Sequence, residues 1–356
     1  MIRRLGLLFL LAIAAAGGFA AWLDPRINKP YKGYPGSEIF IDIPKGTSRW
    51  QVSGMLARDH VIRNRVAFEL LSRFHERYAL QAGEYRFDHP MNAREVFWTI
   101  AKGRIFLYTL TVPEGWTMFD IGSALQRLGL CSRDDFVRAA RDTSPIADIA
   151  PHAHSLEGFL FPSTYQFKHQ ATPEQVVAEM VRKFRNGWQS IDPGGAVPMP
   201  DHFDIQQVVT LASLVERETP QPSERPIVAG VFYNRLAKGY ALQCDPTVQY
   251  ALELQGKTVR NIAHADLAVD SPYNTYEHSG LPPGPIANPG EASLRAALEP
   301  AHTDYFYFVA NDAGGHFFSR TLAEHNRNVA RYRHMLGIGM EPVDANPGSK
   351  KRRGGS

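Results

Sequence analysis

The start of the chain restricts its architecture more than any other segment does. Residues 5–23 carry no charge and follow the basic start "MIRR". Nineteen helical residues are long enough to cross the hydrocarbon core of a bilayer. Trp22 stands at the outer end, where an aromatic anchor belongs. A cleaved signal peptide is the alternative, because "AIAAA" offers small residues to a peptidase, but the apolar stretch is long for one. We expect a transmembrane anchor over residues 1–23.

The charges around this segment predict its orientation. Arg3 and Arg4 precede it, so the positive-inside rule keeps the N-terminus in the cytoplasm. Residues 24–37 are rich in proline and glycine and lack apolar periodicity, which is typical of a linker. The prediction is a single-pass protein of the cell inner membrane with a periplasmic body.

Composition excludes several classes of function. The 356 residues have a net charge of +3, and Lys350, Lys351, Arg352 and Arg353 of the tail supply four positive charges, which leaves 3 − 4 = −1 elsewhere. A nearly neutral body gives no indication of nucleic-acid binding, and we expect residues 341–356 to be a disordered basic tail. Cys131 and Cys244 form no C-x-x-C motif and are interpreted as two free thiols, with a disulfide as the alternative. Since H-E-x-x-H is also absent from the sequence, no metal or other cofactor is expected.

An internal repeat is present in the first half of the chain. Residues 41–62 and 110–131 each contain an apolar strand end, a Pro-x-Gly turn and a helix, and a second short helix follows each. The first copy, with "AGEYRF" as a returning strand, resembles LysM, a carbohydrate-binding module of cell-wall proteins. We expect a LysM-like module over residues 38–105, with a purely structural α+β module as the alternative, and a second strand–helix module over residues 106–154.

Residues 155–340 have the pattern of an α+β domain. Thr172 and Pro173 are the N-cap and first residue of an expected helix. Two further helices are expected over residues 204–219 and 223–239, then a long proline- and glycine-rich loop that leads into a short helix, and finally a hairpin before a last helix. The fold class is therefore α+β, with an N-terminal membrane helix.

The stretch "LASLVERET" contains two glutamates on different faces of a helix. Glu216 and Glu218 point about 200° apart, because each helical residue advances about 100°. Glu218 extends the apolar stripe of Leu211 and Leu214, so its carboxyl group should be partly desolvated, which raises its pKa as a general acid requires. The alternative is a structural Glu218 paired with an arginine such as Arg225 or Arg235.

Two other stretches indicate a carbohydrate cleft. Gln243, Asp245 and Thr247 alternate along "LQCDPTVQY" and would share one face of an extended segment. Asn274 and Tyr276 lie in the stiff loop "SPYNTYEHSGLPPGP". Polar and aromatic groups on a rigid loop suit sugar hydroxyls, although each stretch alone could be structural.

Five blocks together resemble a known family. "LASLVERET", "VFYNRL", "LQCDPTVQY", "SPYNTYEHSGLPPGPIANPG" and "YFYFVANDAGGHFF" are similar to successive blocks of the endolytic murein transglycosylases, the MltG or YceG-like family. The resemblance implies that Glu218 is the acid/base for cleavage of the MurNAc–GlcNAc β-1,4 bond in nascent peptidoglycan, with 1,6-anhydro-MurNAc ends as product. It also implies peptidoglycan strands as substrate, termination of glycan elongation, and peptidoglycan synthases as partners.

The resemblance extends to a block around Glu157 and Tyr165, which we add to the candidate substrate-binding residues. Ser163 stands where the family usually has aspartate, and Cys244 where it often has serine. Two other functions remain open. One is a hydrolytic muramidase, which would need a second carboxylate such as Glu157 or Asp245. The other is a non-catalytic scaffold that binds peptidoglycan.

Overall fold

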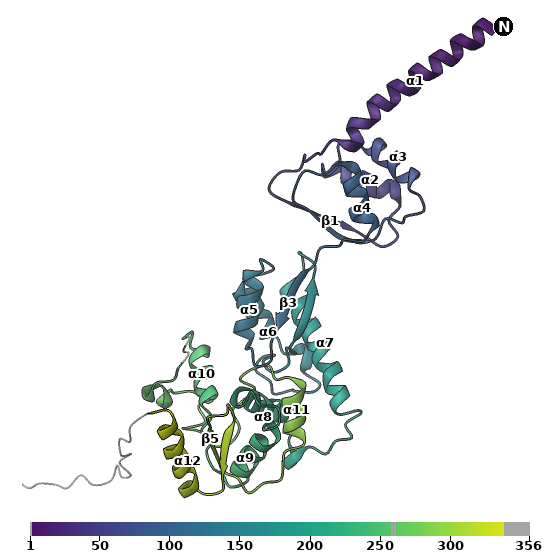
Figure 1. The fold of residues 1–356 in the computed structure, drawn as a ribbon. Helices are drawn as coiled ribbons and strands as arrows, with labels where there is room; N and C mark the ends of the chain where they lie inside the picture. Colours follow the sequence, from purple (N-terminus) through teal and green to yellow (C-terminus); the bar gives the residue numbers. More distant parts are fainter. Residues whose placement is uncertain (1, 258, 260, 338–356) are drawn as a thin grey trace, which may run out of the picture. The chain divides into compact units, whose positions relative to one another are not determined.

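The computed structural model is a mixed α+β protein, as the sequence predicts, and it describes residues 2–257, 259 and 261–337 (Figure 1). The expected basic tail, residues 341–356, lies outside the described residues. The chain divides into two compact units: unit 1 consists of Met1–Thr109 with Gln166–His169, and unit 2 of Leu110–Tyr165 with Gln170–Ser356.

The N-terminal helix α1 runs over Ile2–Asn28, and its part from Gly6 is long and apolar enough to cross a membrane. It passes through Pro25 and ends five residues beyond the expected boundary at Leu23. The continuation has a packing cause, because Leu23 and Ile27 join the hydrophobic core of unit 1. Tyr34 is also buried there, so part of the expected linker is folded structure.

Unit 1 contains a two-stranded sheet and three short helices. Strand β1 (Ile39–Ile43) pairs antiparallel with β2 (Gly83–Phe87), and the helices are α2 (Arg49–Arg58), α3 (Arg65–Phe74) and α4 (Ala93–Ala101). Ser48, Asn64 and Asn92 cap the three helices, since each side chain accepts a backbone N–H of the first turn. The returning strand expected at "AGEYRF" is β2.

The second copy of the repeat has the expected order of strand and helices. Strand β3 (Tyr108–Val112) leads into α5 (Met118–Arg127) and α6 (Arg133–Ala140), with Thr117 as the cap of α5. The short helix η1 (Ser144–Ile146) follows, and β3 pairs with β4 (Ser163–Phe167). The strand–helix–helix repeat is therefore confirmed, whereas the two copies use different partner strands.

The remainder of unit 2 is mainly helical. It consists of α7 (Pro173–Ile191), η2 (Pro200–His202), α8 (Ile205–Glu218), α9 (Arg225–Ala237), α10 (Asp245–Leu254), η3 (His264–Ala268), α11 (Glu291–Leu298), the antiparallel hairpin of β5 (Tyr307–Ala310) and β6 (His316–Ser319), and α12 (Leu322–Met335). Helix α8 packs against α9, α10 and α11 and is apolar on nearly every side. An apolar helix of this kind forms the centre of a domain.

One expectation about local structure is wrong. Residues 243–247 were expected to be extended, but Asp245 begins α10 and Pro246 occupies its first turn. Proline is favoured there because its fixed φ suits a helix and the N–H it lacks would be unpaired anyway. Gln243, Asp245 and Thr247 consequently do not form one polar row.

A buried amide joins three loops of unit 2. The Asn288 Oδ1 accepts the N–H groups of Gly158 and Leu160, both at 2.9 Å. Its Nδ2 donates to the Trp116 carbonyl at 2.9 Å and to Glu157 Oε1 at 2.7 Å. Every polar atom of this side chain is thus paired within the protein, so its loss would leave several buried groups unsatisfied.

We expect Asn288→Ala to lower the free energy of unfolding of unit 2 by about 3 kcal/mol or more, because a buried unpaired group costs about 1–3 kcal/mol. Thermal unfolding of the full chain in detergent measures the loss. Asn326→Ala is the matched control, since Asn326 is exposed on α12 and should change stability by no more than about 0.5 kcal/mol. Equal melting temperatures for the two variants would contradict the assigned role of Asn288.

Candidate active site

The candidate site lies at the C-terminal end of α8. Asp204 caps the other end of this helix and forms a capping box with Gln207. Leu211 and Leu214 are fully buried along its length, which fixes the rotation of the helix. The last turn then directs Glu216 and Glu218 into different surroundings.

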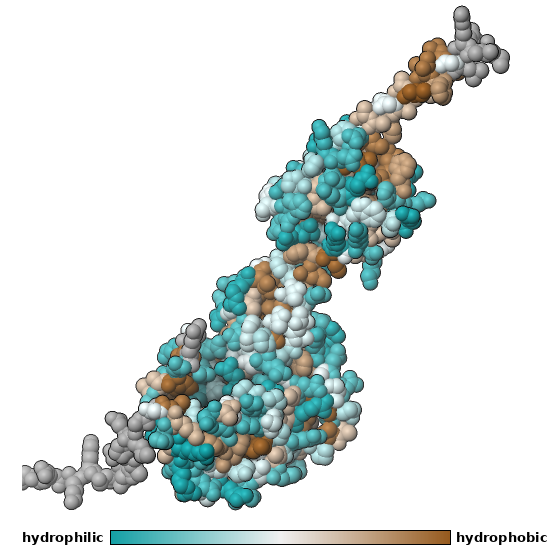
Figure 2. Space-filling view, in the orientation of Figure 1, coloured by the Kyte–Doolittle hydropathy of each residue, from teal (hydrophilic) through white to brown (hydrophobic). Residues whose placement is uncertain are grey.

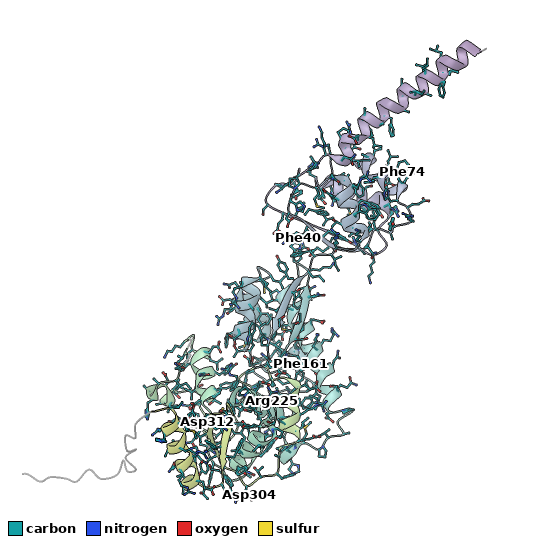
Figure 3. All side chains as sticks on the ribbon, viewed as in Figure 1. Phe40, Phe74, Phe161, Arg225, Asp304 and Asp312 are labelled. Atoms are coloured by element: carbon teal, nitrogen blue, oxygen red, sulfur yellow. The ribbon has the colours of Figure 1, made fainter. Side chains whose placement is uncertain are left out.

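Glu216 is held by two donors inside unit 2. Its Oε1 accepts from Arg225 Nη2 at 2.9 Å, and its Oε2 accepts from the Gly290 N–H at 2.9 Å (Arg225 is labelled in Figure 3). The side chain is almost fully buried, and burial raises its pKa, opposed by the Gly290 and Arg225 interactions. This glutamate connects α8 to α9 and α11 rather than facing solvent.

Glu218 faces a pocket of about 500 Å³. The pocket walls come from the start of α10, the loop before it, the 271–276 loop, the β5–β6 hairpin and α12. Among its lining residues are Glu218, Arg235, Gln243, Asp245, Tyr276 and His316. The structure therefore brings four of the sequence-predicted site residues together, and adds an arginine and a histidine.

The surroundings of Glu218 suit an acid that keeps its proton. Burial raises the pKa of its carboxyl group to about 6, and the nearby charge of Asp245 adds to the effect. A hydrogen bond with the Cys244 thiol and the electrostatic effect of His316 act in the opposite direction. A carboxyl group with this pKa can donate and then accept a proton near neutral pH.

Gln243 is held in an unusual backbone conformation. Its φ is +52°, in the left-handed region that non-glycine residues seldom adopt. Arg235 Nη2 donates to its Oε1 at 2.9 Å, while Arg235 Nη1 donates to the Leu242 carbonyl at 2.9 Å. Because the amide oxygen of Gln243 is taken by Arg235, its NH₂ group is the donor left to face a ligand.

Asp245 and Tyr276 form a second polar pair in the pocket, with the Tyr276 hydroxyl donating to Asp245 Oδ1. Burial and this hydrogen bond raise the pKa of Tyr276. The tyrosine therefore remains neutral and presents an aromatic face beside a charged carboxylate. Aromatic and carboxylate groups in one cleft are suited to a sugar ring and its hydroxyls.

His316 and Glu224 form a pair that sequence reasoning did not identify. The His316 Nδ1 lies 2.7 Å from Glu224 Oε2, and its backbone N–H donates to Glu224 Oε1 at 2.8 Å. Thr219, the residue after Glu218, donates from its hydroxyl to Glu224 Oε2 at 3.1 Å. In the sequence, the only local indication of this pair was the histidine within the aromatic hairpin "ANDAGGHFF".

The other four predicted site residues lie inside unit 2. Glu157 accepts the Met118 N–H at 2.9 Å as well as Asn288, and burial raises its pKa to about 8. Asn274 donates to the carbonyls of Leu267 and Val269, both at 2.9 Å. Thr247 donates to the Cys244 carbonyl at 2.6 Å, and Tyr165 donates to the Phe161 carbonyl. All four are nearly or fully buried, and their polar atoms hold loops in place.

In the part of the chain that the structure describes, no three His, Cys, Asp or Glu side chains are arranged to hold a metal ion.

Comparison with known proteins agrees with the blocks found in the sequence. The model of the YceG-like family matches residues 41–331. The endolytic murein transglycosylase of Bacillus subtilis is 33% identical over 330 residues, which cover 88% of this chain and 90% of that protein. The protein of the same name from Streptococcus pneumoniae D39 is 27% identical, and the match covers 91% of this chain and 64% of the relative.

A solved structure gives the same result. The crystal structure of a YceG-like protein from Listeria monocytogenes is 34% identical, with a TM-score of 0.53, and the match covers 82% of this chain and 98% of that one. Since the family model spans most of the chain and the similarity to the relatives extends through both units, this chain belongs to the YceG-like family.

Proposed function

We propose that this chain is an endolytic lytic transglycosylase that cuts the MurNAc–GlcNAc β-1,4 bond of nascent peptidoglycan strands and leaves 1,6-anhydro-MurNAc ends. The observation that carries the proposal is Glu218, a glutamate of raised pKa that faces a pocket lined by polar and aromatic groups. Relatives at up to 33% identity that are named endolytic murein transglycosylases support the substrate class.

Glu218 serves both proton transfers of the reaction. In its protonated form it donates to the glycosidic oxygen, and the bond from that oxygen to C1 of the muramic sugar breaks. The carboxylate then accepts the proton of the 6-hydroxyl of the same sugar, whose oxygen attacks C1 and closes the anhydro ring. An internal nucleophile makes a water molecule or a second catalytic carboxylate unnecessary, because the attacking group is already positioned.

The remaining pocket residues hold the glycan. Gln243 presents its NH₂ group to an acceptor on the sugar, because Arg235 occupies its amide oxygen. Asp245 accepts sugar hydroxyls beside the ring of Tyr276, and its charge helps to keep the proton on Glu218. His316, held by Glu224, faces the same pocket and offers a hydrogen bond from its other ring nitrogen.

A hydrolytic muramidase is the second candidate, and one observation favours it. Asp245 supplies a second carboxylate in the pocket that holds Glu218, and hydrolysis needs two such groups. Mass spectrometry of the fragments separates the two reactions, since a hydrolase leaves reducing ends and a transglycosylase leaves anhydro ends.

The proposed cellular setting follows from α1 and unit 1. A helix able to cross the membrane would place the chain in the cell inner membrane with its N-terminus in the cytoplasm and both units in the periplasm. The order β1–α2–α3–β2 with an antiparallel strand pair supports a LysM-like, glycan-binding role for unit 1. Termination of glycan elongation there would bring the chain beside peptidoglycan synthases, which we propose as partners.

The first test compares the two glutamates of α8 on purified protein with uncrosslinked glycan. We expect Glu218→Gln to lower the release of anhydro-ended fragments at least about a hundredfold while its fold persists, because the acid/base group is lost. Glu216→Gln should lower the melting temperature, since it weakens the contacts with Arg225 and Gly290, yet retain turnover per folded molecule. Loss of activity through Glu216 alone, or unchanged activity in the Glu218 variant, would refute the assignment of Glu218. A wild-type chain that releases no fragments would favour the non-catalytic scaffold.

The second test uses pH. Glu218 must be protonated to act, so kcat/KM should fall as pH rises through about 6. The Cys244 thiol stabilises the carboxylate and lowers this pKa, so Cys244→Ala should move the decline to higher pH. Cys244→Ser is the matched control, because a hydroxyl preserves the hydrogen bond. A decline that stays at the same pH in Cys244→Ala would show that the thiol does not tune Glu218.

The third test concerns topology. We expect a reporter enzyme that works only outside the cytoplasm to be active when fused after Ser37, because α1 carries it across the membrane. A reporter that works only in the cytoplasm, fused at the same position, is the control and should be inactive. The reverse pattern of activities would overturn the proposed orientation.

A further inference from the structure

The outer end of α1 determines how close unit 1 lies to a bilayer. The Trp22 ring stacks on Phe19 at 5.8 Å, and the Arg26 guanidinium lies 4.4 Å from the Trp22 ring centroid. Tryptophan and arginine of this kind mark the membrane–water interface. Ile27, five residues beyond Trp22, is already buried in the core of unit 1. Five helical residues rise about 7.5 Å, so part of unit 1 must lie at the level of the lipid headgroups.

Helix α3 presents a row of apolar side chains on the side of unit 1 that α1 joins. α1 packs against α3 and α4. Val66, Leu70 and Phe74 follow one another at intervals of four residues, and we name them the α3 stripe; Val66 is 52% and Phe74 81% exposed. Arg65 faces α2, with its guanidinium 3.5 Å from the ring centroid of Trp50. Leu70 and Phe74 lie about 140° and 180° around the helix from Arg65, which is the side away from α2.

The views of the molecule agree with this placement. Figure 3 shows Phe74 on the part of unit 1 that α1 joins, whereas Phe40 of β1 lies at the opposite end of the unit. Figure 2 shows apolar residues gathered beside the base of α1. The α3 stripe therefore continues the apolar surface of α1, whose side chains from Leu7 to Phe19 are exposed.

Three arginines lie close to the α3 stripe along the chain. Arg63, Arg73 and Arg77 are all exposed, and their long side chains can reach lipid phosphates while their methylene groups cover apolar surface. The acidic groups nearby are Glu76, which is exposed, and Glu69, which pairs with Arg73 at 3.6 Å. The balance is basic, which suits an anionic membrane surface.

We propose that the α3 stripe and its arginines rest in the headgroup region of the bilayer that holds α1. This inference depends on the proposed membrane insertion of α1. An aromatic and aliphatic row with a basic border is the composition by which interfacial helices bind membranes. Two contacts, a spanning helix and a surface helix, would fix the orientation of unit 1 relative to the membrane, which one helix alone could not do.

The test measures lipid contact at single positions of the full chain. Phe74→Cys, Leu10→Cys and Asp42→Cys are labelled with bimane and reconstituted into vesicles of phosphatidylethanolamine and phosphatidylglycerol that carry nitroxide-labelled lipids, which quench bimane at short range. Leu10 lies in α1 and Asp42 in β1, beside Phe40. The wild-type chain, labelled in the same way, gives the background from Cys131 and Cys244. Exposed positions such as Phe74 tolerate substitution, so the fold should persist.

We expect strong quenching at position 10, and quenching at position 74 several-fold greater than at position 42. Replacing phosphatidylglycerol with phosphatidylcholine should reduce the quenching at position 74 and leave that at position 10 unchanged. Equal quenching at positions 74 and 42, with position 10 quenched, would overturn this inference alone and would favour a protein ligand for the α3 stripe. An unquenched label at position 10 would overturn both the inference and the proposed anchor, whereas neither result bears on the assay of Glu218.

Discussion

The distribution of hydrogen-bond donors between two glutamates of α8 is the interaction on which the candidate site depends. Arg225 and the Gly290 N–H both bind Glu216 and oppose the rise in its pKa that burial causes. At Glu218 the interactions that oppose the effect of burial are a hydrogen bond with the weak thiol donor of Cys244 and the electrostatic effects of His316 and Arg217. Burial raises the pKa of both glutamates, but Glu216 is paired with two donors inside unit 2, whereas Glu218 faces the pocket. Two glutamates of one helix turn therefore differ: Glu216 links helices inside unit 2, and Glu218 is the proposed acid/base group.

Much of the fold could be predicted from local patterns. Caps such as Thr172 and apolar periodicity located the helices. The angle between Glu216 and Glu218 around the helix correctly indicated that the two side chains would have different environments. The same patterns could not distinguish an exposed polar residue from a buried one. Asn274 and Glu157 have the composition expected of a glycan cleft, yet both are paired inside the protein. Glu157 is buried against Asn288, which is more than a hundred residues away in the sequence. No local pattern contains that information.

The base of α1 shows tertiary packing overriding a strong local signal. Pro25 and the prolines after it predicted that the helix would end and a flexible linker begin, yet the helix continues to Asn28. Proline within a helix costs about 3 kcal/mol in an isolated case. Burial of Leu23 and Ile27 in the core of unit 1 offsets this cost. The consequence is a stiff connection, because the apolar segment of α1 and the core of unit 1 share one helix rather than being joined by a flexible tether.

The burial that suits Glu218 to its proposed role as the acid/base group also costs stability. Its pKa rises from 4.5 to about 6 on folding, so the native state binds this proton more tightly than the unfolded chain does. The contribution of Glu218 to stability is therefore full below pH 4.5 and is lost as pH rises through about 6, a loss of about 2 kcal/mol. Unit 2 must tolerate this loss at neutral pH, and the fully paired amide of Asn288 is a favourable term of similar size. A mobile, hydrated Glu218 would avoid the cost, but it would release its proton near pH 4.5 and would no longer be an effective acid where the proposed reaction takes place.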